Sequence, residues 1–362
     1  MVFIYSADVS GLENNLKLLS EKIAIFFGES NYIFPDFYQL FIYFKKQNSR
    51  RKKTILVIDE CSYLADASPE INFIFQKIVD EYLDNSNIKI ILVGNHLGIV
   101  KSLQKYDNPL YQRISFQKQI LPFDYLETSA FYPDLTSVEK IKFYSVFGVM
   151  PFVLNKINPK KDLKKNISEI YFQNDDILNT DVINILGHEN KRINSYVPIL
   201  KFIAGKNRQI KDISSYTQKP TSVILPLINN LLEMEILKKE VSFGENSLSP
   251  KKTNYSFKDP YFNFCYYFLR NKLSEFVILD HETFFKNYIK YSLEPFIILT
   301  FKKICQTFLK EYHHTKAIQV SRYWDNNYKS KENIEIDIVL EQLNNKLIFL
   351  SVNSLLILLE IA

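Results

Sequence analysis

Two carboxylates that follow a hydrophobic run without a spacer are the residues best placed to do chemistry. Asp59 and Glu60 come directly after the aliphatic run Ile55–Ile58. Burying an unpaired carboxylate is costly, so such a pair needs a compensating partner. Mg²⁺ bound to nucleotide phosphates is one such partner: Asp59 would hold the metal through water, and Glu60 would orient the attacking water. The alternative is a strand that ends in two solvated acids.

The elements around this pair predict where it lies. Three of the four aliphatic residues in Ile55–Ile58 are β-branched, which favours a strand buried on both faces of a parallel sheet. A helix over Pro69–Leu83 and a second strand over Ile88–Val93 complete a βαβ unit. Asn95 then reaches the same edge as the acidic pair, where it could hold the attacking water. It could equally be a turn residue after Gly94.

Further elements flank this unit. We expect a strand over Val2–Tyr5, a helix over Leu12–Phe27 that ends at Gly28, and a helix over Asp36–Lys46. Arg113 follows another short helix and could stabilise charge on a transferred phosphoryl group, or it could form an ordinary ion pair. A strand is expected to close at Leu121–Phe123.

The amino-acid composition limits the classes to which this protein can belong. The chain has 362 residues, 46% of them hydrophobic and 15% aromatic, which is enough for several packed domains. The net charge of +5 does not by itself indicate a nucleic-acid-binding protein. Three widely spaced cysteines argue against a disulfide framework, and no uninterrupted apolar run is long enough to span a bilayer. We expect a cytoplasmic protein without membrane association.

The order of the motifs resembles the archaeal-type AAA+/STAND P-loop ATPases of prokaryotes that carry a winged helix and a C-terminal nuclease-like domain of the DUF234 type. In these terms Ile55–Glu60 is the Walker B box and Asn95 is sensor 1. The resemblance extends over nearly the whole chain, and its motifs are weak singly but specific in their order. The other carriers are Tyr63-Leu64, Ile91–Asn95, Pro109–Arg113, Leu121–Phe123, Phe147–Phe152, Phe257–Phe264 and Glu335–Val339.

The resemblance implies an α/β fold class and four parts. A partial P-loop NTPase parallel sheet is expected over residues 1–135, and a helical lid over 136–190. A winged helix is expected over 191–258, and an α/β restriction-endonuclease-like domain over 259–362. ATP and Mg²⁺ are the implied cofactors, with Asp59 as the metal-binding residue and Glu60, Asn95 and Arg113 as the catalytic ones.

One departure concerns the phosphate-binding loop. No Gly-x-x-x-x-Gly-Lys-Ser/Thr occurs in the chain, and its Gly-Lys dipeptide, Gly205-Lys206, is followed by Asn207. The resemblance places the missing loop upstream of Met1. Without backbone N–H groups around the phosphates and a lysine to neutralise them, we expect weak ATP binding and little or no hydrolysis.

The predicted winged helix suggests a different kind of function. Lys219, Thr221 and Ser222 begin its third helix, where recognition helices contact base edges. A DNA-binding regulator is therefore one alternative. A module for protein contacts or homo-oligomerisation is the other, because the start of this helix is not strongly basic.

The C-terminal part resembles a nuclease fold that has lost most of its metal site. Asp337 remains, but Lys302 stands at the position of the helical glutamate, and Phe349–Asn353 lacks the Glu-x-Lys of the following strand. One carboxylate cannot assemble a two-metal site, so we expect no nuclease activity. The five histidines have no zinc-ligand spacing.

Overall fold

The computed structural model divides the chain into two compact units, residues 1–120 and 121–362. It describes residues 1–29, 32–48, 53–83, 86–94, 103, 105–173, 193–246, 252–312, 317–327, 332–343 and 346–352. Among these residues, no helix combines the length and the hydropathy that crossing a lipid bilayer requires.

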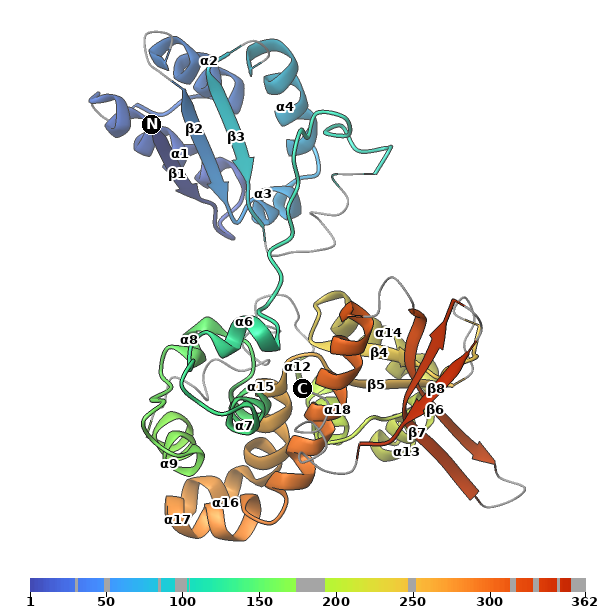
Figure 1. Cartoon of the computed structure of the whole chain (residues 1–362). Helices are drawn as coiled ribbons and strands as arrows, with labels where there is room; N and C mark the ends of the chain where they lie inside the picture. Colours follow the sequence, from blue (N-terminus) through green and yellow to red (C-terminus); the bar gives the residue numbers. More distant parts are fainter. Residues whose placement is uncertain are drawn as a thin grey trace. The chain divides into compact units, whose positions relative to one another are not determined.

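A three-stranded parallel sheet organises the N-terminal unit (Figure 1). Strand β2 lies in the middle, with Ile4 of β1 and Ile91 of β3 paired to Val57 on either side. The predicted order of strands and helices is confirmed. The elements are β1 (Val2–Ser6), α1 (Leu12–Phe27), α2 (Phe37–Asn48), β2 (Thr54–Asp59), α3 (Ser62–Ala67), α4 (Ile71–Ile78), the π-helix η1 (Val79–Leu83) and β3 (Ile88–Leu92).

Helix α1 ends where the sequence predicts. Gly28 adopts the left-handed conformation, with φ of 81°, and its backbone N–H binds the last carbonyl groups of the helix. A residue with a Cβ is disfavoured in this conformation, which explains why a glycine terminates the helix.

Among the described residues, the helices pack on one face of the sheet. On the other face Ile55 and Val57 of β2 are only half-buried, so the prediction that β2 is buried on both faces is wrong. Leu56 and Ile58 are 0% exposed and pack with α1, α2 and α4 residues in one hydrophobic cluster. On the opposite face Ile4 is 63% and Ile91 is 45% exposed. Alternate residues of a strand point to opposite faces, and no described element covers the second face.

The strand expected before Leu121 is also absent. Residues 114–124 form neither helix nor strand, and Phe116 and Ile120 are 78% and 91% exposed. A segment with scattered apolar residues, such as 114–121, becomes a strand only when a neighbouring strand pairs with it. None of the described strands does so here. This segment crosses the boundary between the two units.

The second unit begins with helices, followed by a helix–hairpin arrangement in the order predicted for a winged helix. The first group comprises α6 (Tyr125–Ser129), α7 (Ser137–Phe147), α8 (Pro151–Leu154), α9 (Leu163–Ile167) and η2 (Ser168–Phe172). The second comprises α12 (Ile193–Ile203), α13 (Ile210–Thr217), α14 (Thr221–Glu233) and the antiparallel strands β4 (Leu237–Val241) and β5 (Thr253–Phe257).

The C-terminal part combines a helical layer with an antiparallel sheet in the order β6-β7-β8. The long helix α18 contacts β6 and β7 of this sheet (Figure 1). The elements are α15 (Pro260–Phe264), η3 (Cys265–Leu269), η4 (Arg270–Lys272), α16 (Leu273–Ile278), α17 (His281–Phe284), η5 (Phe285–Ile289), α18 (Leu293–Tyr312), β6 (Ala317–Asn327), β7 (Glu332–Gln342) and β8 (Leu347–Leu350).

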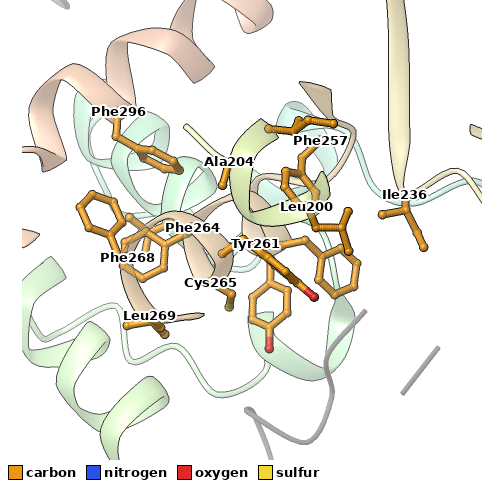
Figure 2. Packing of buried hydrophobic residues seen from close by; sticks show 14 of the residues in the cluster. Leu200, Ala204, Ile236, Phe257, Tyr261, Phe264, Cys265, Phe268, Leu269 and Phe296 are labelled. Atoms are coloured by element: carbon orange, nitrogen blue, oxygen red, sulfur yellow. The ribbon is translucent and has the colours of Figure 1, made fainter. Parts of the chain in front are cut away.

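One hydrophobic core joins the parts of the second unit. It extends from Tyr132 through α12 and α14 to Phe296, so the helices from α7 to η2, the helix–hairpin segment and the start of the C-terminal part share it. Figure 2 shows the rings of Phe264, Phe268 and Phe296 packed together, with centroids 4.8 to 5.9 Å apart. The aromatic stretch that begins at residue 261 is therefore part of the core.

Candidate nucleotide site and the C-terminal domain

Backbone hydrogen bonds fix the end of β2 between its two neighbours. The N–H of Ala7 binds the carbonyl of Asp59 at 2.9 Å, and the N–H of Cys61 binds the carbonyl of Val93 at 2.9 Å. The acidic pair therefore lies at the carboxyl edge of the central parallel strand, where open α/β sheets bind ligands. Asn95, expected at the same edge, lies outside the described residues.

Glu60 has an unusual backbone conformation at this edge. Its φ is 54°, in the left-handed region that few residues other than glycine adopt. Its N–H binds Oδ1 of Asp59 at 3.0 Å, so the first carboxylate of the pair stabilises the turn that carries the second. Such strain is enriched at functional sites.

A third acid, Asp8, lies at the same edge and was not recognised in the sequence. It follows β1, and Ala7, the residue before it, bonds to Asp59. The Ser10 hydroxyl and N–H lower the pKa of Asp8 by stabilising its ionised form. The signal was present, because Asp8 comes two residues after the end of β1, and Asp59 is the last residue of the neighbouring β2.

A buried asparagine stabilises the loop that carries Asp8. Asn15, 0% exposed, accepts hydrogen bonds from the Tyr5 hydroxyl at 2.7 Å and the Asp8 N–H at 2.9 Å. Its amide donates to the carbonyls of Asp8 at 3.0 Å and Gly11 at 2.7 Å. All the polar atoms of this side chain are thus satisfied inside the core.

The charge at this edge acts on Cys61. Burial, followed by the charges of Glu60 and Asp59, raises the pKa of the Cys61 thiol to about 11. The two carboxylates therefore produce a negative potential next to the core, which is the electrostatic environment that a divalent cation requires.

Arg113 is engaged elsewhere in the N-terminal unit. Its Nε and Nη2 donate to the two carboxylate oxygens of Asp80 at 2.7 and 2.8 Å. This ion pair lowers the pKa of Asp80. The guanidinium also donates to the carbonyls of Pro109 and Tyr111. A catalytic role for Arg113 would require this bidentate pair to open.

The Gly205-Lys206 dipeptide belongs to a tight turn after α12. Gly205 has φ of 73°, its N–H donates to the Asn263 side chain at 2.8 Å, and a Cβ at this position would lie 2.2 Å from the ring of Tyr267. The glycine is therefore required for packing against the aromatic core. This packing explains the glycine at position 205 without a role in phosphate binding.

The residues predicted to contact DNA are exposed, but their helix carries no cation. Lys219, Thr221 and Ser222 are exposed at the start of α14. Among the solvent-facing residues that follow, Val223 is 48% and Leu225 is 44% exposed, and α14 contains no lysine or arginine. The exposed residues of α14 are thus a mixture of apolar and polar side chains, and the charged residue among them is the acid Glu233.

The β4–β5 hairpin is tied to the C-terminal sheet. The N–H of Phe243 donates to the carbonyl of Arg322 at 2.7 Å, and the Ser242 hydroxyl bonds to the backbone of Trp324 at 3.1 and 3.2 Å. Lys252 forms an ion pair with Asp325 at 2.9 Å. This side of the hairpin is occupied by intramolecular contacts.

Asp337, the nuclease remnant, is enclosed by partners from the same chain. It is 5% exposed, Lys302 Nζ lies 2.6 Å from Oδ1, and the Val352 N–H donates to Oδ2 at 2.9 Å. No group of three or more potential metal ligands occurs among the described residues. The lysine that replaces the expected helical glutamate thus neutralises the remaining acid.

Comparison with known proteins agrees with this arrangement. Residues 265–353, which hold Asp337 and its partners, match the family DUF234, described as archaeal and bacterial proteins of unknown function. This stretch is a DUF234 domain. The match covers α18 and all three strands of the C-terminal sheet, and it confirms the domain type that the sequence predicts.

Two similar proteins extend the comparison beyond the DUF234 domain. The uncharacterized protein MJECL04 of Methanocaldococcus jannaschii is 26% identical over 303 residues, or 82% of this chain. The chain spans 66% of that relative, slightly less than two thirds of its length. The Walker-type ATPase Paby2304 of Pyrococcus abyssi has a TM-score of 0.51 at 18% identity, and the match covers 73% of this chain and 83% of that one.

The structural likeness concerns the fold. The chain has a parallel three-stranded sheet near its N-terminus and antiparallel sheets afterwards, and this α/β arrangement is similar to that of the Walker-type ATPase. A DUF234 domain combined with an ATPase-like fold is the combination that the motif order predicts.

Proposed function

We propose that the chain is an ATP-binding protein of the AAA+/STAND type that hydrolyses little or no ATP on its own. The observation that carries the proposal is the position of Asp59 and Glu60 at the carboxyl end of the central parallel strand. The likeness of the fold to a Walker-type ATPase supports it. Asp59 would hold Mg²⁺ and Glu60 would orient water, while Asn95 and Arg113 are the remaining candidates for contact with the γ-phosphate.

The residues present fit the cation better than the phosphates. Asp59 and Glu60 lie at the end of β2, and Asp8 follows the neighbouring strand. The described residues bring no three potential metal ligands together, so the cation would take its other ligands from the nucleotide phosphates and water. No glycine-rich loop with a lysine is available to surround the phosphates. Weak, magnesium-dependent binding is the behaviour that this combination supports.

The edge of the sheet at β3 leaves room for a further strand and helix. Strand β3 pairs with β2 on one side only among the described strands, and Ile91 and Val93 are 45% and 42% exposed beside it. A strand and helix added there would cover these residues. A phosphate-binding loop on that element would reach the edge that carries Asp59.

The test is calorimetric titration of the full chain with ATP, with and without Mg²⁺. We expect weak binding that requires Mg²⁺ and is lost in Asp59→Asn, while the exposed control Asp107→Asn binds as the wild type does. We also expect ATP turnover no higher than that of Glu60→Gln. Binding that ignores Mg²⁺ or survives Asp59→Asn would refute the proposal.

A second candidate is a protein-interaction module that acts through the helix–hairpin segment, either with another protein or between copies of this chain. The exposed Val223 and Leu225 on a helix without cations favour protein contacts over DNA. Sedimentation of the wild type and of Val223→Asp/Leu225→Asp tests self-association. If instead this segment binds DNA, a gel shift will weaken in Lys219→Ala and its salt dependence will become less steep.

A further inference from the structure

A cluster of lysines lies on the loop between α8 and α9 and at the start of α9. The stretch Pro151–Lys165 contains five lysines and a single acid, Asp162. The formal net charge of this stretch is therefore +4, whereas the formal net charge of the whole chain is +5. We call residues 155–165 the lysine loop. Its lysines are Lys156, Lys160, Lys161, Lys164 and Lys165.

A buried asparagine holds the lysine loop in one conformation. Asn166 is 1% exposed, and its amide donates to the carbonyls of Asn158, Lys161 and Asp162 at 3.0 Å each. Its oxygen accepts the N–H of Asn158 at 2.8 Å. A lysine-bearing backbone that is already ordered loses less entropy when it binds a ligand.

Two further hydrogen bonds hold the loop. The Asn158 side chain accepts the N–H of Lys160 at 3.0 Å, which sets the turn. The Asp162 carboxylate accepts the N–H of Lys165 at 2.7 Å and caps the start of α9. The one acid of the stretch therefore has a structural task.

The five lysines divide into three that have a described partner and two that do not. Lys161 pairs with Glu169 at 2.6 Å, Lys164 pairs with Glu282, and Lys156 lies over the Phe152 ring at 4.1 Å. Lys160 and Lys165 are exposed, and within the described residues no carboxylate forms an ion pair with either. Within the described part of the chain, these two ammonium groups are open to an external anion.

We propose that the lysine loop binds the phosphodiester backbone of a nucleic acid, with Lys160 and Lys165 contacting phosphates. Binding of this kind is independent of base sequence and depends steeply on salt. None of the loop's residues belongs to the proposed nucleotide site or to the start of α14.

The surroundings of the loop favour a nucleic acid over a lipid surface. Membrane-binding segments place a wide apolar face in the bilayer beside their cations. The large apolar side chain that is exposed here is Phe152, 44% exposed, and Lys156 covers one face of its ring. Helix α9 has five residues, too few for a broad amphipathic face.

The test is fluorescence anisotropy of labelled single-stranded and duplex DNA and of single-stranded RNA, titrated with the full chain over a range of salt concentrations. We expect Lys160→Ala/Lys165→Ala to bind more weakly and to lower the slope of log affinity against log salt by roughly one per lysine. The matched control is Lys17→Ala/Lys310→Ala, which removes two exposed lysines elsewhere, and the comparator Lys219→Ala tests α14.

Each outcome decides the proposal. A slope that falls in the loop variant and not in the control or comparator supports it. Equal slopes in the loop variant and the wild type overturn it, as does the absence of binding to any of the three nucleic acids at low salt. If the chain floats with phosphatidylserine vesicles and does not bind nucleic acid, the loop binds a membrane surface, and the proposal is overturned. Thermal unfolding confirms that every variant is folded.

Discussion

The carboxylate of Asp259 occupies the space in which a side chain at Gly148 would begin. A Cβ built on Gly148 would lie 2.1 Å from Oδ1 of Asp259 and 2.6 Å from the backbone nitrogen of Tyr261. The same Oδ1 accepts the Tyr261 N–H at 2.8 Å and caps α15. The end of α7 and the start of the aromatic core are therefore joined at one point, without room for an additional methyl group.

Replacing Gly148 with alanine should destabilise the fold by more than about 3 kcal/mol, because the methyl group meets backbone as well as side-chain atoms. The backbone adds strain, since φ at this residue is 65°. Gly244→Ala is the matched control: its φ is 80°, but no atom lies within 4 Å of the added Cβ, so it should cost about 1 kcal/mol. Urea unfolding measures both. Equal costs would show that the contact with Asp259 contributes nothing.

Asp259 should make stability depend on pH. Burial raises the pKa of this carboxyl to about 7, although the N–H groups of Tyr261 and Val149 favour the ionised form. The folded chain thus prefers the protonated acid. Its contribution is greatest below about pH 4 and is lost as the pH rises to about 7, at about 1.4 kcal/mol per pKa unit. Asp259→Asn should gain stability over the wild type between pH 5 and 8 in urea unfolding; parallel curves would contradict this.

The pair of Lys302 and Asp337 should be strongly coupled. Lys302→Met leaves a carboxylate that is 5% exposed without its cation and should cost about 3 kcal/mol. The same substitution in an Asp337→Asn background should cost much less. Lys310→Met, which removes an exposed cation from the same helix, should change stability by under about 0.5 kcal/mol. Additive effects of the two substitutions would rule out the coupling.

Lys303 should destabilise the fold at neutral pH. Burial, and then the charge of Lys238, lowers the pKa of Lys303 to about 7, against an opposing effect of Glu240. A base with a lowered pKa contributes most above its unfolded value of 10.5, and stability is lost as the pH falls from there to about 7. Lys303→Met should therefore be more stable than the wild type at pH 7, with the gain shrinking towards pH 10. A gain independent of pH would point to packing alone.

Local patterns made much of the fold predictable. Helical spacing and Gly28 fixed the extent of α1, and the aliphatic runs before Asp59 and Gly94 identified β2 and β3. The edge position of the acidic pair followed from parallel pairing alone. These features depend on neighbours in sequence or on general rules of sheet geometry.

The errors concern contacts that the sequence does not encode locally. Whether β2 is covered on both faces depends on which helices pack against it, and the segment before Leu121 needed a pairing partner that sequence reasoning could not supply. The roles of Asn15 and Asn166 were missed for a related reason. An asparagine inside a helix is ordinarily a solvent-facing residue, and only the folded loops beside these two reveal their hydrogen bonds.

The extended segment 114–124 has a consequence for handling the protein. Its backbone lacks the helical and sheet hydrogen bonds that protect neighbouring segments, and Phe116, which is followed by Gln117, is 78% exposed. Chymotrypsin cleaves after such side chains when the chain can enter its active site. Brief digestion should therefore release the acidic-pair sheet from the DUF234-bearing fragment, and so give two pieces in which ATP and nucleic-acid binding can be assayed apart.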